Sequence, residues 1–549
     1  MTTINAKDFN INPDKDITVN LAKLNSRLSS IDGEKNVIFE KGTYYISSDK
    51  CEKHMLYITN TAGDKEYSKG ETPHLNAVAF YYGNVSNITV DGNDSIFVID
   101  GKVTNMAMEN CENVTIKNIE IRHTHPDMHE LRVIRKSPFS IDFKADDDTL
   151  YEVKNGKLQF FGTDYITCSD RKASNATWIG LIRKDAPNKI KRVIHPLFST
   201  FRVKNLDNRK IRAYFPNTFR FKTDDCFYIF DVRRQFAGIF VNKCENVTLQ
   251  NIKQRFNYSL ALVAQDSKNI TVDSVEFAPE KDSPRKMASV ADFIQICMCR
   301  GNITIKNSLF DGAGDDCLNT HGIHFKIIKI SGKELTVRFM HPQSHGFNPL
   351  RSGDEIAFIN TDTLLENGRA TIEASELLNE YEIKLIVSNT NGAEIGNVIE
   401  DVSACPNLEF KNNTMTRIIT RGILVTTRGK VNIENNHFVS TTMSNILLSD
   451  DAENWYESGM CRDVTIQNNT FDFCGGTPIL IKPENKKYLG AVHKNIRIIN
   501  NTFKKHKSPC IDVKATDNII IKNNKSLSGG KIKITNCDNI KIDYRKEYG

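Results

Sequence analysis

Hydrophobic and polar residues alternate along much of the chain in one short pattern that returns many times. Each copy has a small or polar residue, a turn former, a run of alternating β-branched residues and a second Asn or Gly, as in ENVTIKNI from Glu112 and ENVTLQNI from Glu245. A period of two predicts short strands, and Asn at their ends predicts tight turns, because Asn tolerates positive φ and bonds to its own backbone. The copies begin at Ser86, Glu112, Glu245, Lys268, Gly301, Pro406, Gly429, Arg462, Lys494, Asp517 and Asp538.

The spacing of these copies predicts the architecture. Most steps are between 21 and 33 residues long. A unit this short cannot bury a hydrophobic face by itself, so neighbouring units must stack. We therefore expect an all-β fold, a right-handed parallel β-helix, in which aliphatic pairs such as Val114 and Ile116 stack inside from coil to coil. The turn residues should form an Asn ladder along the outside.

Two steps are far longer than one coil. Asn113 and Asn246 are 133 residues apart, and Asn302 and Asn407 are 105 apart. Removing one coil of about 25 residues leaves inserts of about 110 and 80 residues, whose alternating pieces and Gly turns predict small β-barrel-like domains. Helical spacing over residues 16–30 predicts a cap on the N-terminal end. The expected domains are residues 1–126 (cap and first coils), 127–234 (first insert), 235–322 (central coils), 323–400 (second insert) and 401–549 (last coils).

Composition narrows the class of protein. Hydrophobic residues make up 39% and charged residues 26% of the 549 positions, with a net charge of +6, as in an ordinary folded chain. No apolar run approaches the roughly 18 residues of a membrane span, and the absence of long basic blocks argues against a nucleic-acid partner. The 13 cysteines form no C-x-x-C pair, so we expect packed free thiols. The opening MTTINAKDFN has no signal-peptide features, which leaves a cytoplasmic protein or a trimmed signal.

Three aspartates are spaced like the coils themselves. Asp292 lies 23 and 24 residues before Asp315 and Asp316, so the three should meet on adjacent coils about 4.8 Å apart. Clustered carboxylates raise one another's pKa, and glycoside hydrolysis needs one protonated and one ionised carboxyl group. Asp-Asp after Gly also caps turns or binds Ca²⁺, so this pattern alone leaves both readings open.

The order A-D, then D-D-x-x-N-x-H-G about one coil later on a β-helix, resembles glycoside hydrolase family 110. The stretches TRGILVTTRGKVNIENNHF and DDAENWYESG add to the likeness, which covers most of the chain. The resemblance implies a β-helix with two inserted β-barrels and exo-acting α-1,3-galactosidase activity on Galα1-3Gal, and in some members on the branched blood-group B antigen. It also implies inversion at the anomeric carbon, no metal or other cofactor, an α-galactosyl oligosaccharide or glycoconjugate as partner, and a homodimer.

The resemblance also assigns residues. The catalytic aspartates fall on Asp292, Asp315 and Asp316, with Asp315 as the expected general acid and the other two holding the attacking water. In an inverting site the acid and base lie about 6.5–9.5 Å apart. An aromatic ring stacks on the apolar face of a sugar, and polar side chains bind its hydroxyls. The residues expected to contact substrate, each of which also suits a turn, a packing contact or a loop, are Asn319, His321, Arg421, Asp451, Trp455, Glu457 and Arg233. His341 and His345 either reach the groove from the second insert or belong to an ordinary loop.

Two departures from the family pattern bear on specificity. The chain reads RHTHPDMHELR from Arg122 where the family often has D-W-x-R-P, and it has Gln295 where the family often has His. Three other functions stay open from the residues: a polygalacturonase-like hydrolase, whose R-I-K signature is absent, a non-catalytic glycan-binding β-helix, and a metal-dependent lyase.

Overall fold

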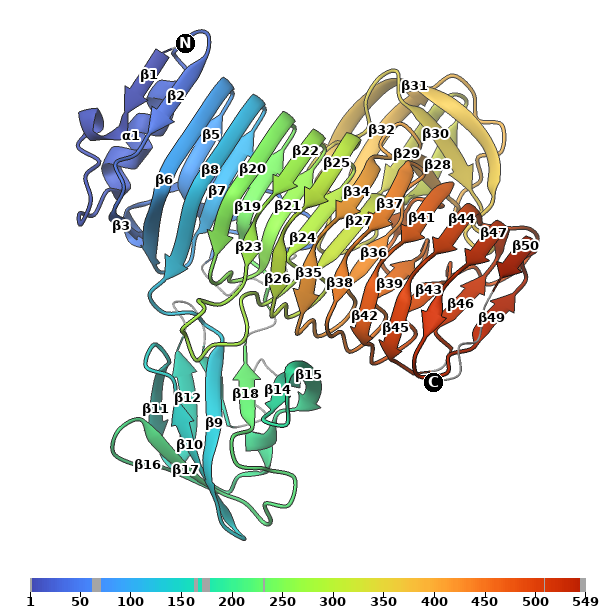
Figure 1. Cartoon of the computed structure of the whole chain (residues 1–549). Coiled ribbons are helices and arrows are strands. Elements are labelled where there is room, and N and C mark those ends of the chain that lie inside the picture. The colour runs from blue at the N-terminus through green and yellow to red at the C-terminus, as the bar shows by residue number, and fades with distance from the viewer. Residues whose placement is uncertain are drawn as a thin grey trace.

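The computed structural model describes residues 2–61, 71–161, 166–169, 178–230, 233–507 and 509–543, without the side chains of 166–168 and 178. It is a long parallel β-helix with two inserted domains on its side (Figure 1). The predicted all-β fold class is therefore confirmed. The β-helix has three faces, two of which share one 21-stranded sheet while the third is a separate 13-stranded sheet.

The first face runs along the whole β-helix. Its strands are β1 (Thr2–Asn5), β2 (Lys35–Ile38), β6 (Ser86–Asp100), β8 (Glu112–His123), β20 (Glu245–Gln254), β22 (Lys268–Asp273), β25 (Arg300–Lys306), β34 (Asn407–Lys411), β37 (Lys430–Glu434), β41 (Asp463–Gln467), β44 (His493–Ile499), β47 (Thr516–Lys522) and β50 (Asp538–Asp543). The long strands β6, β8 and β20 continue onto the second face. Its other strands are β3 (Thr43–Ser47), β23 (Glu276–Phe277), β26 (Leu309–Asp311), β35 (Thr414–Thr416), β38 (His437–Phe438), β42 (Thr470–Phe473), β45 (Thr502–Lys505) and β48 (Lys525–Ser526).

The third face is the sheet that carries the candidate site. Its strands are β4 (Glu52–Met55), β5 (Leu75–Gly83), β7 (Thr104–Glu109), β19 (Ala237–Asn242), β21 (Leu260–Gln265), β24 (Ile294–Cys297), β27 (Leu318–Ile323), β36 (Ile423–Val425), β39 (Ile446–Leu448), β43 (Ile479–Ile481), β46 (Ile511–Lys514) and β49 (Ile532–Thr535). The short strand β40 (Glu457–Ser458) pairs antiparallel with β27.

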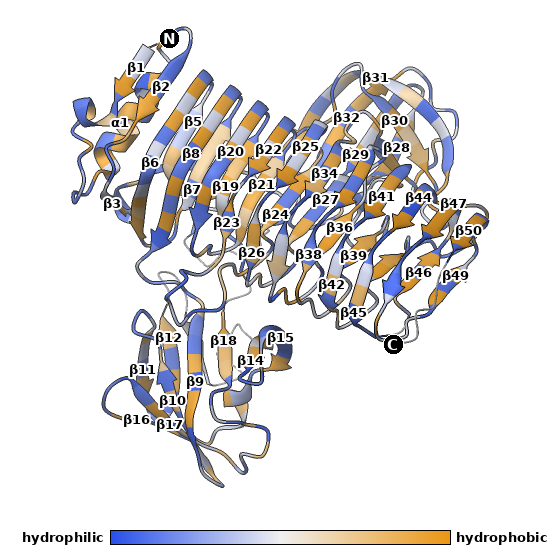
Figure 2. Ribbon diagram, in the orientation of Figure 1, coloured by the Kyte–Doolittle hydropathy of each residue, from blue (hydrophilic) through white to orange (hydrophobic). Residues whose placement is uncertain are grey.

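Stacked aliphatic side chains fill the interior. Val114 pairs with Val247, Val247 with Ile270, and Ile270 with Ile303 on successive coils, and all four are buried. The strands therefore alternate between apolar and polar positions along their length (Figure 2). Each fully buried aliphatic side chain contributes about 1.5–3 kcal/mol. A one-residue slip in register would turn these side chains to the solvent, so the repeat also fixes how the coils align.

Asparagine ladders link the turns, as the sequence predicts. Asn113 donates to Asn87, Asn246 to Asn113, and Asn269 to Asn246, each over 2.9 Å. All four residues adopt positive φ, between 54° and 58°. A second ladder is buried in the last coils, where the main-chain N–H of one Asn donates to Oδ1 of the Asn on the next coil and the side-chain amides donate to main-chain carbonyls. Its members are Asn413, Asn436, Asn469, Asn501 and Asn524.

The N-terminal end is closed by a helix. α1 (Thr18–Leu28) buries Leu21, Leu24 and Leu28 against the first coils, beside the short 3-10 helices η1 (Ala6–Phe9) and η2 (Ser48–Lys50). This is the cap expected over residues 16–30. No helix in the described part of the chain is long and apolar enough to cross a membrane. The cysteines whose side chains are described are all free thiols.

The first insert is a seven-stranded antiparallel sheet beside a three-stranded one. The larger sheet contains β9 (His129–Lys136), β10 (Ser140–Ala145), β14 (Trp178–Arg183), β15 (Ala186–Ile194), β16 (Arg202–Asn205), β17 (Lys210–Tyr214) and β18 (Cys226–Ile229). The smaller sheet contains β11 (Leu150–Lys154), β12 (Lys157–Phe161) and β13 (Ile166–Cys168), and the 3-10 helix η4 (Pro196–Ser199) follows β15. This domain projects away from the β-helix (Figure 1).

The second insert is a closed six-stranded barrel. Its strands are β28 (Phe325–Ser331), β29 (Glu334–Arg338), β30 (Glu355–Ile359), β31 (Glu366–Asn379), β32 (Glu382–Val387) and β33 (Val398–Asp401). The barrel has its own apolar core, which includes Ile327, Phe358 and Leu385.

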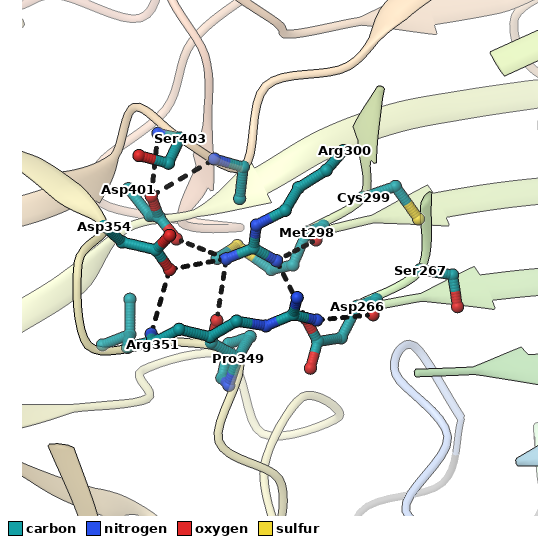
Figure 3. Close-up of polar contacts among 12 residues, drawn as sticks. Asp266, Ser267, Met298, Cys299, Arg300, Pro349, Arg351, Asp354, Asp401 and Ser403 are labelled. Atoms are coloured by element: carbon teal, nitrogen blue, oxygen red, sulfur yellow. Dashed lines mark hydrogen bonds and ion pairs between the residues drawn. The ribbon is translucent and has the colours of Figure 1, made fainter. Parts of the chain in front are cut away.

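A buried ion cluster fastens this barrel to the β-helix (Figure 3). Arg300, at the start of β25, binds Asp266 of the neighbouring coil over 2.9 Å. The same guanidinium binds Asp354 over 2.7 Å and Asp401 over 3.1 Å, both from the barrel. Arg351 adds a second bond to Asp266 over 2.6 Å. The barrel is therefore held where the coils turn from the third face to the first.

Candidate active site

Three consecutive coils place polar residues at one equivalent position of the third face. Ile294 of β24 pairs with Leu318 of β27, and Leu318 pairs with Ile423 of β36. The residues two positions before each of these are Asp292, Asp316 and Arg421, so they stack in register. The predicted coil spacing of the aspartates is what brings them together.

Main-chain hydrogen bonds lock this stack. The Asp316 N–H donates to Asp292 Oδ1 over 2.9 Å, and the Arg421 N–H donates to Asp316 Oδ1 over 2.9 Å. The Arg421 guanidinium binds the same Asp316 carboxylate, with Nη2 to Oδ2 at 2.9 Å. Asp292 and Asp316 thus each accept a hydrogen bond from a main-chain N–H of the next coil, and this bond fixes the orientation of the carboxylate.

The three aspartates form one compact group. Asp292, Asp315 and Asp316 each offer an oxygen within 4.8 Å of the others. Asp292 and Asp316 are only 4% and 2% exposed, whereas the Asp315 side chain is 24% exposed. Asp315 is therefore the carboxyl group that is most open to an incoming ligand.

Arg234 and Thr420 hold Asp315. Arg234 lies where the first insert rejoins the β-helix, and its Nη2 binds Asp315 Oδ2. The Thr420 hydroxyl donates to Asp315 Oδ1 over 3.0 Å and also contacts Asp316. Two guanidinium groups, from Arg234 and Arg421, therefore face three carboxyl groups.

These contacts separate the pKa values of the group. Burial raises the pKa of Asp292 well above its ordinary value, and the charge of Asp315 adds to the rise. Burial also raises the pKa of Asp316, more than Arg421 lowers it. Burial acts on Asp315 in the same direction, but the charges of Arg234 and Arg421 outweigh it and hold the pKa of Asp315 below its ordinary value. The unliganded site thus favours a proton on Asp292 and a negative charge on Asp315.

The next outward-facing residues of the same strands form a polar floor. Gln295 pairs with Asn319 across β24 and β27, and both are buried. Asn319 Nδ2 donates to Glu457 Oε1 over 2.8 Å, and Gln295 Nε2 contacts His321 Nε2 over 2.5 Å. The amide oxygens of Gln295 and Asn319 have no hydrogen-bond partner among the residues that the structure describes. Buried acceptors in this state suit a ligand that brings hydroxyl donors.

The loop before β40 supplies an aromatic wall. The Trp455 side chain is 60% exposed. Asp451 accepts hydrogen bonds from the N–H groups of Glu453, Asn454 and Trp455 at 2.8–3.0 Å. Asp451 therefore shapes the loop and presents Trp455, which is the loop-forming role weighed for it in the sequence.

The second insert reaches the same place. The His341 ring lies 5.3 Å from the Trp455 ring, and burial together with the charges of His321 and Arg234 lowers the pKa of His341 to about 4. His345 stacks on Tyr381 and lies 3.3 Å from His74, so it belongs to the contact between the barrel and the β-helix. Of the two histidines, His341 is the one beside the candidate site.

The first insert contributes a residue that the sequence did not single out. Arg233 was the expected substrate contact, and the structure shows it half-buried, while its neighbour Arg234 makes the bond to Asp315. Thr420 was also missed. Arg233 and Arg234 lie where the chain returns from a long insert, outside the repeat. No periodic pattern therefore predicts which of the two contacts the aspartates. Arg122 begins the segment that differs from the family pattern, and it pairs with Glu120 and Glu280.

Known proteins resemble the chain along most of its length. It is 33% identical to alpha-1,3-galactosidase A of Bacteroides thetaiotaomicron over 526 residues, covering 92% of this chain and 90% of that protein. It is 31% identical to alpha-1,3-galactosidase A of Akkermansia muciniphila over 474 residues, covering 83% and 76%. It is 28% identical to alpha-1,3-galactosidase B of Phocaeicola vulgatus over 533 residues, covering 90% and 84%.

The second insert matches a family of its own. Residues 334–397 match the domain described as GLAA-B beta-barrel domain II. Among solved structures, PfbA, a surface adhesin of Streptococcus pneumoniae, shares 12% identity at a TM-score of 0.44 over 98% of this chain and 91% of that one, a likeness too low to inform function.

The fold, the carboxylate group and these relatives define the class of protein as a β-helix glycoside hydrolase. The chain belongs to the α-1,3-galactosidase family, as its resemblance to glycoside hydrolase family 110 predicted.

Proposed function

We propose that this protein is an exo-acting α-1,3-galactosidase that releases terminal galactose from Galα1-3Gal-containing glycans with inversion; the assay below decides whether the branched blood-group B antigen is a substrate as well as the linear glycan. The observation that carries the proposal is the group of three aspartates held by Arg234 and Arg421 beside a polar floor with unpaired acceptors. A galactose residue supplies the hydroxyl donors that this floor lacks. The names of the relatives support the linkage.

We assign the roles within the trio by exposure and by charge. Asp315 is the most exposed carboxyl group, so it protonates the leaving oxygen. Asp292 and Asp316, buried and joined through a main-chain hydrogen bond, hold the attacking water, and one of them acts as base. Since the unliganded site keeps Asp315 ionised through Arg234, acid catalysis requires that substrate draws Arg234 away and lets Asp315 take up the proton of the trio. The apparent pKa values then belong to the trio as a unit.

No metal takes part in this scheme. The oxygens of the trio are close enough to bind a cation, but the two guanidinium groups already neutralise most of their charge. Activity should therefore persist in excess EDTA. The same arginines argue against a polygalacturonase-like function, because they bind the aspartates where a uronate-cleaving site needs cations for the substrate.

The proposed activity is tested by measuring free galactose from Galα1-3Gal, Galα1-4Gal and the fucosylated B trisaccharide in parallel. Release from the α-1,3 substrates alone, with β-galactose as the first anomer seen by NMR, is the expected result. Release of α-galactose first would exclude inversion. No release from any substrate would withdraw the galactosidase proposal and make Gln295 and the segment from Arg122 the first positions to examine. Light scattering of the same sample tests the homodimer that the resemblance implies.

Trp455→Ala is expected to raise KM for Galα1-3Gal about tenfold and to leave kcat nearly unchanged, because stacking of a sugar on an exposed ring contributes about 1.5 kcal/mol. Trp455→Phe, which retains an aromatic ring, should retain most of the affinity. Initial-rate kinetics on the parent, Trp455→Ala and Trp455→Phe measures KM and kcat for each. An unchanged KM in the Ala variant would show that Trp455 only packs against His341.

Arg234→Gln is expected to shift the whole pH profile of kcat/KM to higher pH. The Arg234 charge favours the ionised forms of Asp315 and Asp292 and so lowers the pKa of both. Removing it raises both values, so the limb that reports loss of the acid proton and the limb that reports ionisation of the base move upward together. Arg233→Gln is the matched control and should keep both limbs in place. Limbs that stay fixed in Arg234→Gln would exclude Arg234 from control of the catalytic proton.

A further inference from the structure

The far end of the first insert carries three exposed phenylalanines. Phe139, Phe201 and Phe219 are 65%, 65% and 88% exposed. Phe139 lies in the turn between β9 and β10, Phe201 just before β16, and Phe219 in the loop after β17. This end of the domain points away from the β-helix (Figure 1). Exposed apolar side chains mark a contact surface where they gather in one patch rather than lie singly.

Hydrogen bonds hold the three segments together as one surface, here called the aromatic tip (residues 135–141, 199–204 and 212–222). The Phe215 N–H donates to the Phe139 carbonyl over 2.9 Å, and the Phe201 N–H donates to the Tyr214 carbonyl over 3.1 Å. The Thr218 hydroxyl donates to the Ser137 carbonyl over 2.6 Å, which fixes the loop that bears Phe219. The exposed rings therefore sit on an ordered support.

The aromatic tip is strongly basic. Its three segments contain seven Lys and Arg and no Asp or Glu, and two of the seven, Arg212 and Lys222, pair with Asp142 and Asp185 outside the segments. The whole insert, residues 127–234, has 22 basic against 14 acidic residues, a net charge of +8, whereas the complete chain has +6. The rest of the molecule is thus slightly acidic. Within the tip, Arg135, Lys136, Arg202, Lys204 and Arg220 are exposed.

We propose that the aromatic tip docks on an anionic lipid bilayer, with the phenylalanine rings entering the interfacial region and the surrounding cations contacting phosphate and carboxylate headgroups. Apolar side chains surrounded by Lys and Arg are typical of segments that bind at the membrane interface. A symmetric contact with a second copy would bring like charges together. The proposal is independent of the proposed catalytic activity.

The test is co-sedimentation of the full chain with vesicles of phosphatidylcholine alone and of phosphatidylcholine mixed with phosphatidylserine. Binding to the mixed vesicles is expected, with weakening at high salt because the headgroup contacts are screened. The triple variant Phe139→Ser, Phe201→Ser, Phe219→Ser should bind roughly tenfold more weakly or worse. Ile395→Ser is the matched control, since Ile395 is 67% exposed on the second insert, and it should bind like the parent.

Two further measurements separate membrane docking from a loss of folding. The triple variant should retain the parent's thermal unfolding curve, and Arg135→Gln with Arg202→Gln should weaken binding to the mixed vesicles even with the rings in place. Equal binding by parent and triple variant, or no binding by the parent, would overturn the proposal. A dimeric parent that becomes monomeric in the triple variant would assign the tip to a second copy and would overturn it too.

Discussion

Asp315→Asn is expected to lower kcat for galactose release from Galα1-3Gal by about 10²- to 10⁴-fold, the range that a positioned general acid contributes. The amide has the shape of the carboxyl group and can still accept from Thr420, so the coil should stay folded. It has no proton to give to the leaving oxygen. Thermal unfolding and glycan binding by the variant should remain close to those of the parent.

The leaving group separates the acid from the water-binding aspartates. With 4-nitrophenyl α-galactoside the departing phenolate needs little protonation, so the loss in Asp315→Asn should shrink by orders of magnitude. Asp292→Asn and Asp316→Asn should lose the same factor on both substrates, because the attacking water is needed in either case. Asp273→Asn is the matched control. Asp273 lies on β22, bonded to Asn307, and its variant should keep full activity.

The outcomes assign the roles without ambiguity. In the contrary outcome, the activated leaving group reduces the loss of activity in Asp292→Asn and leaves it unchanged in Asp315→Asn. That result would assign the general acid to Asp292, where the unliganded site favours the proton. A variant that still binds glycan while the parent shows no turnover would support the glycan-binding alternative. Comparable activity in Asp315→Asn and Asp273→Asn would remove the trio from the chemistry.

The trio could be found in the sequence because its spacing equals that of a coil. In a β-helix, residues one coil apart occupy the same position of adjacent strands, and this rule alone places Asp292 beside Asp316. The strands and turns followed from the same periodicity. Asn319 and His321 were predicted because they share the segment of Asp315 and Asp316, and Glu457 because it lies in the DDAENWYESG stretch. The structure brings the three together on the floor.

The residues that escaped prediction depend on long-range geometry. Arg234 comes to Asp315 only because a first insert of about a hundred residues returns to the β-helix at that point. Asp451, a predicted substrate contact, also accepts hydrogen bonds from the N–H groups of Glu453 and Trp455, a capping role that only the folded loop reveals. The attachment of the second insert depends on Arg300, which is one of 73 Lys and Arg and belongs to no repeat signal.

Arg300→Met is expected to destabilise the protein by about 3–5 kcal/mol, the cost of leaving buried carboxylates without their cation. Asp266 and Asp401 are 2% and 0% exposed in their side chains, so water cannot replace the guanidinium. Arg351→Met is the matched control. Arg351 is 48% exposed and binds Asp266 from the rim, so its loss should cost about 1 kcal/mol or less. Urea unfolding, followed by tryptophan fluorescence, measures both.

The destabilisation caused by Arg300→Met should depend on pH. Burial and the charge of Asp354 raise the pKa of Asp401 to about 7, against the opposing charge of Arg300. A folded pKa above the unfolded one stabilises the fold at low pH, and that stabilisation is lost as pH rises through about 7. Without Arg300 the pKa of Asp401 rises further, so Arg300→Met should be more destabilising at pH 8 than at pH 5. Equal destabilisation at the two pH values would mean that Arg300 acts through packing alone. Because the barrel carries His341 to Trp455, the variant should also raise KM for Galα1-3Gal at the higher pH, whereas Arg351→Met should leave KM unchanged.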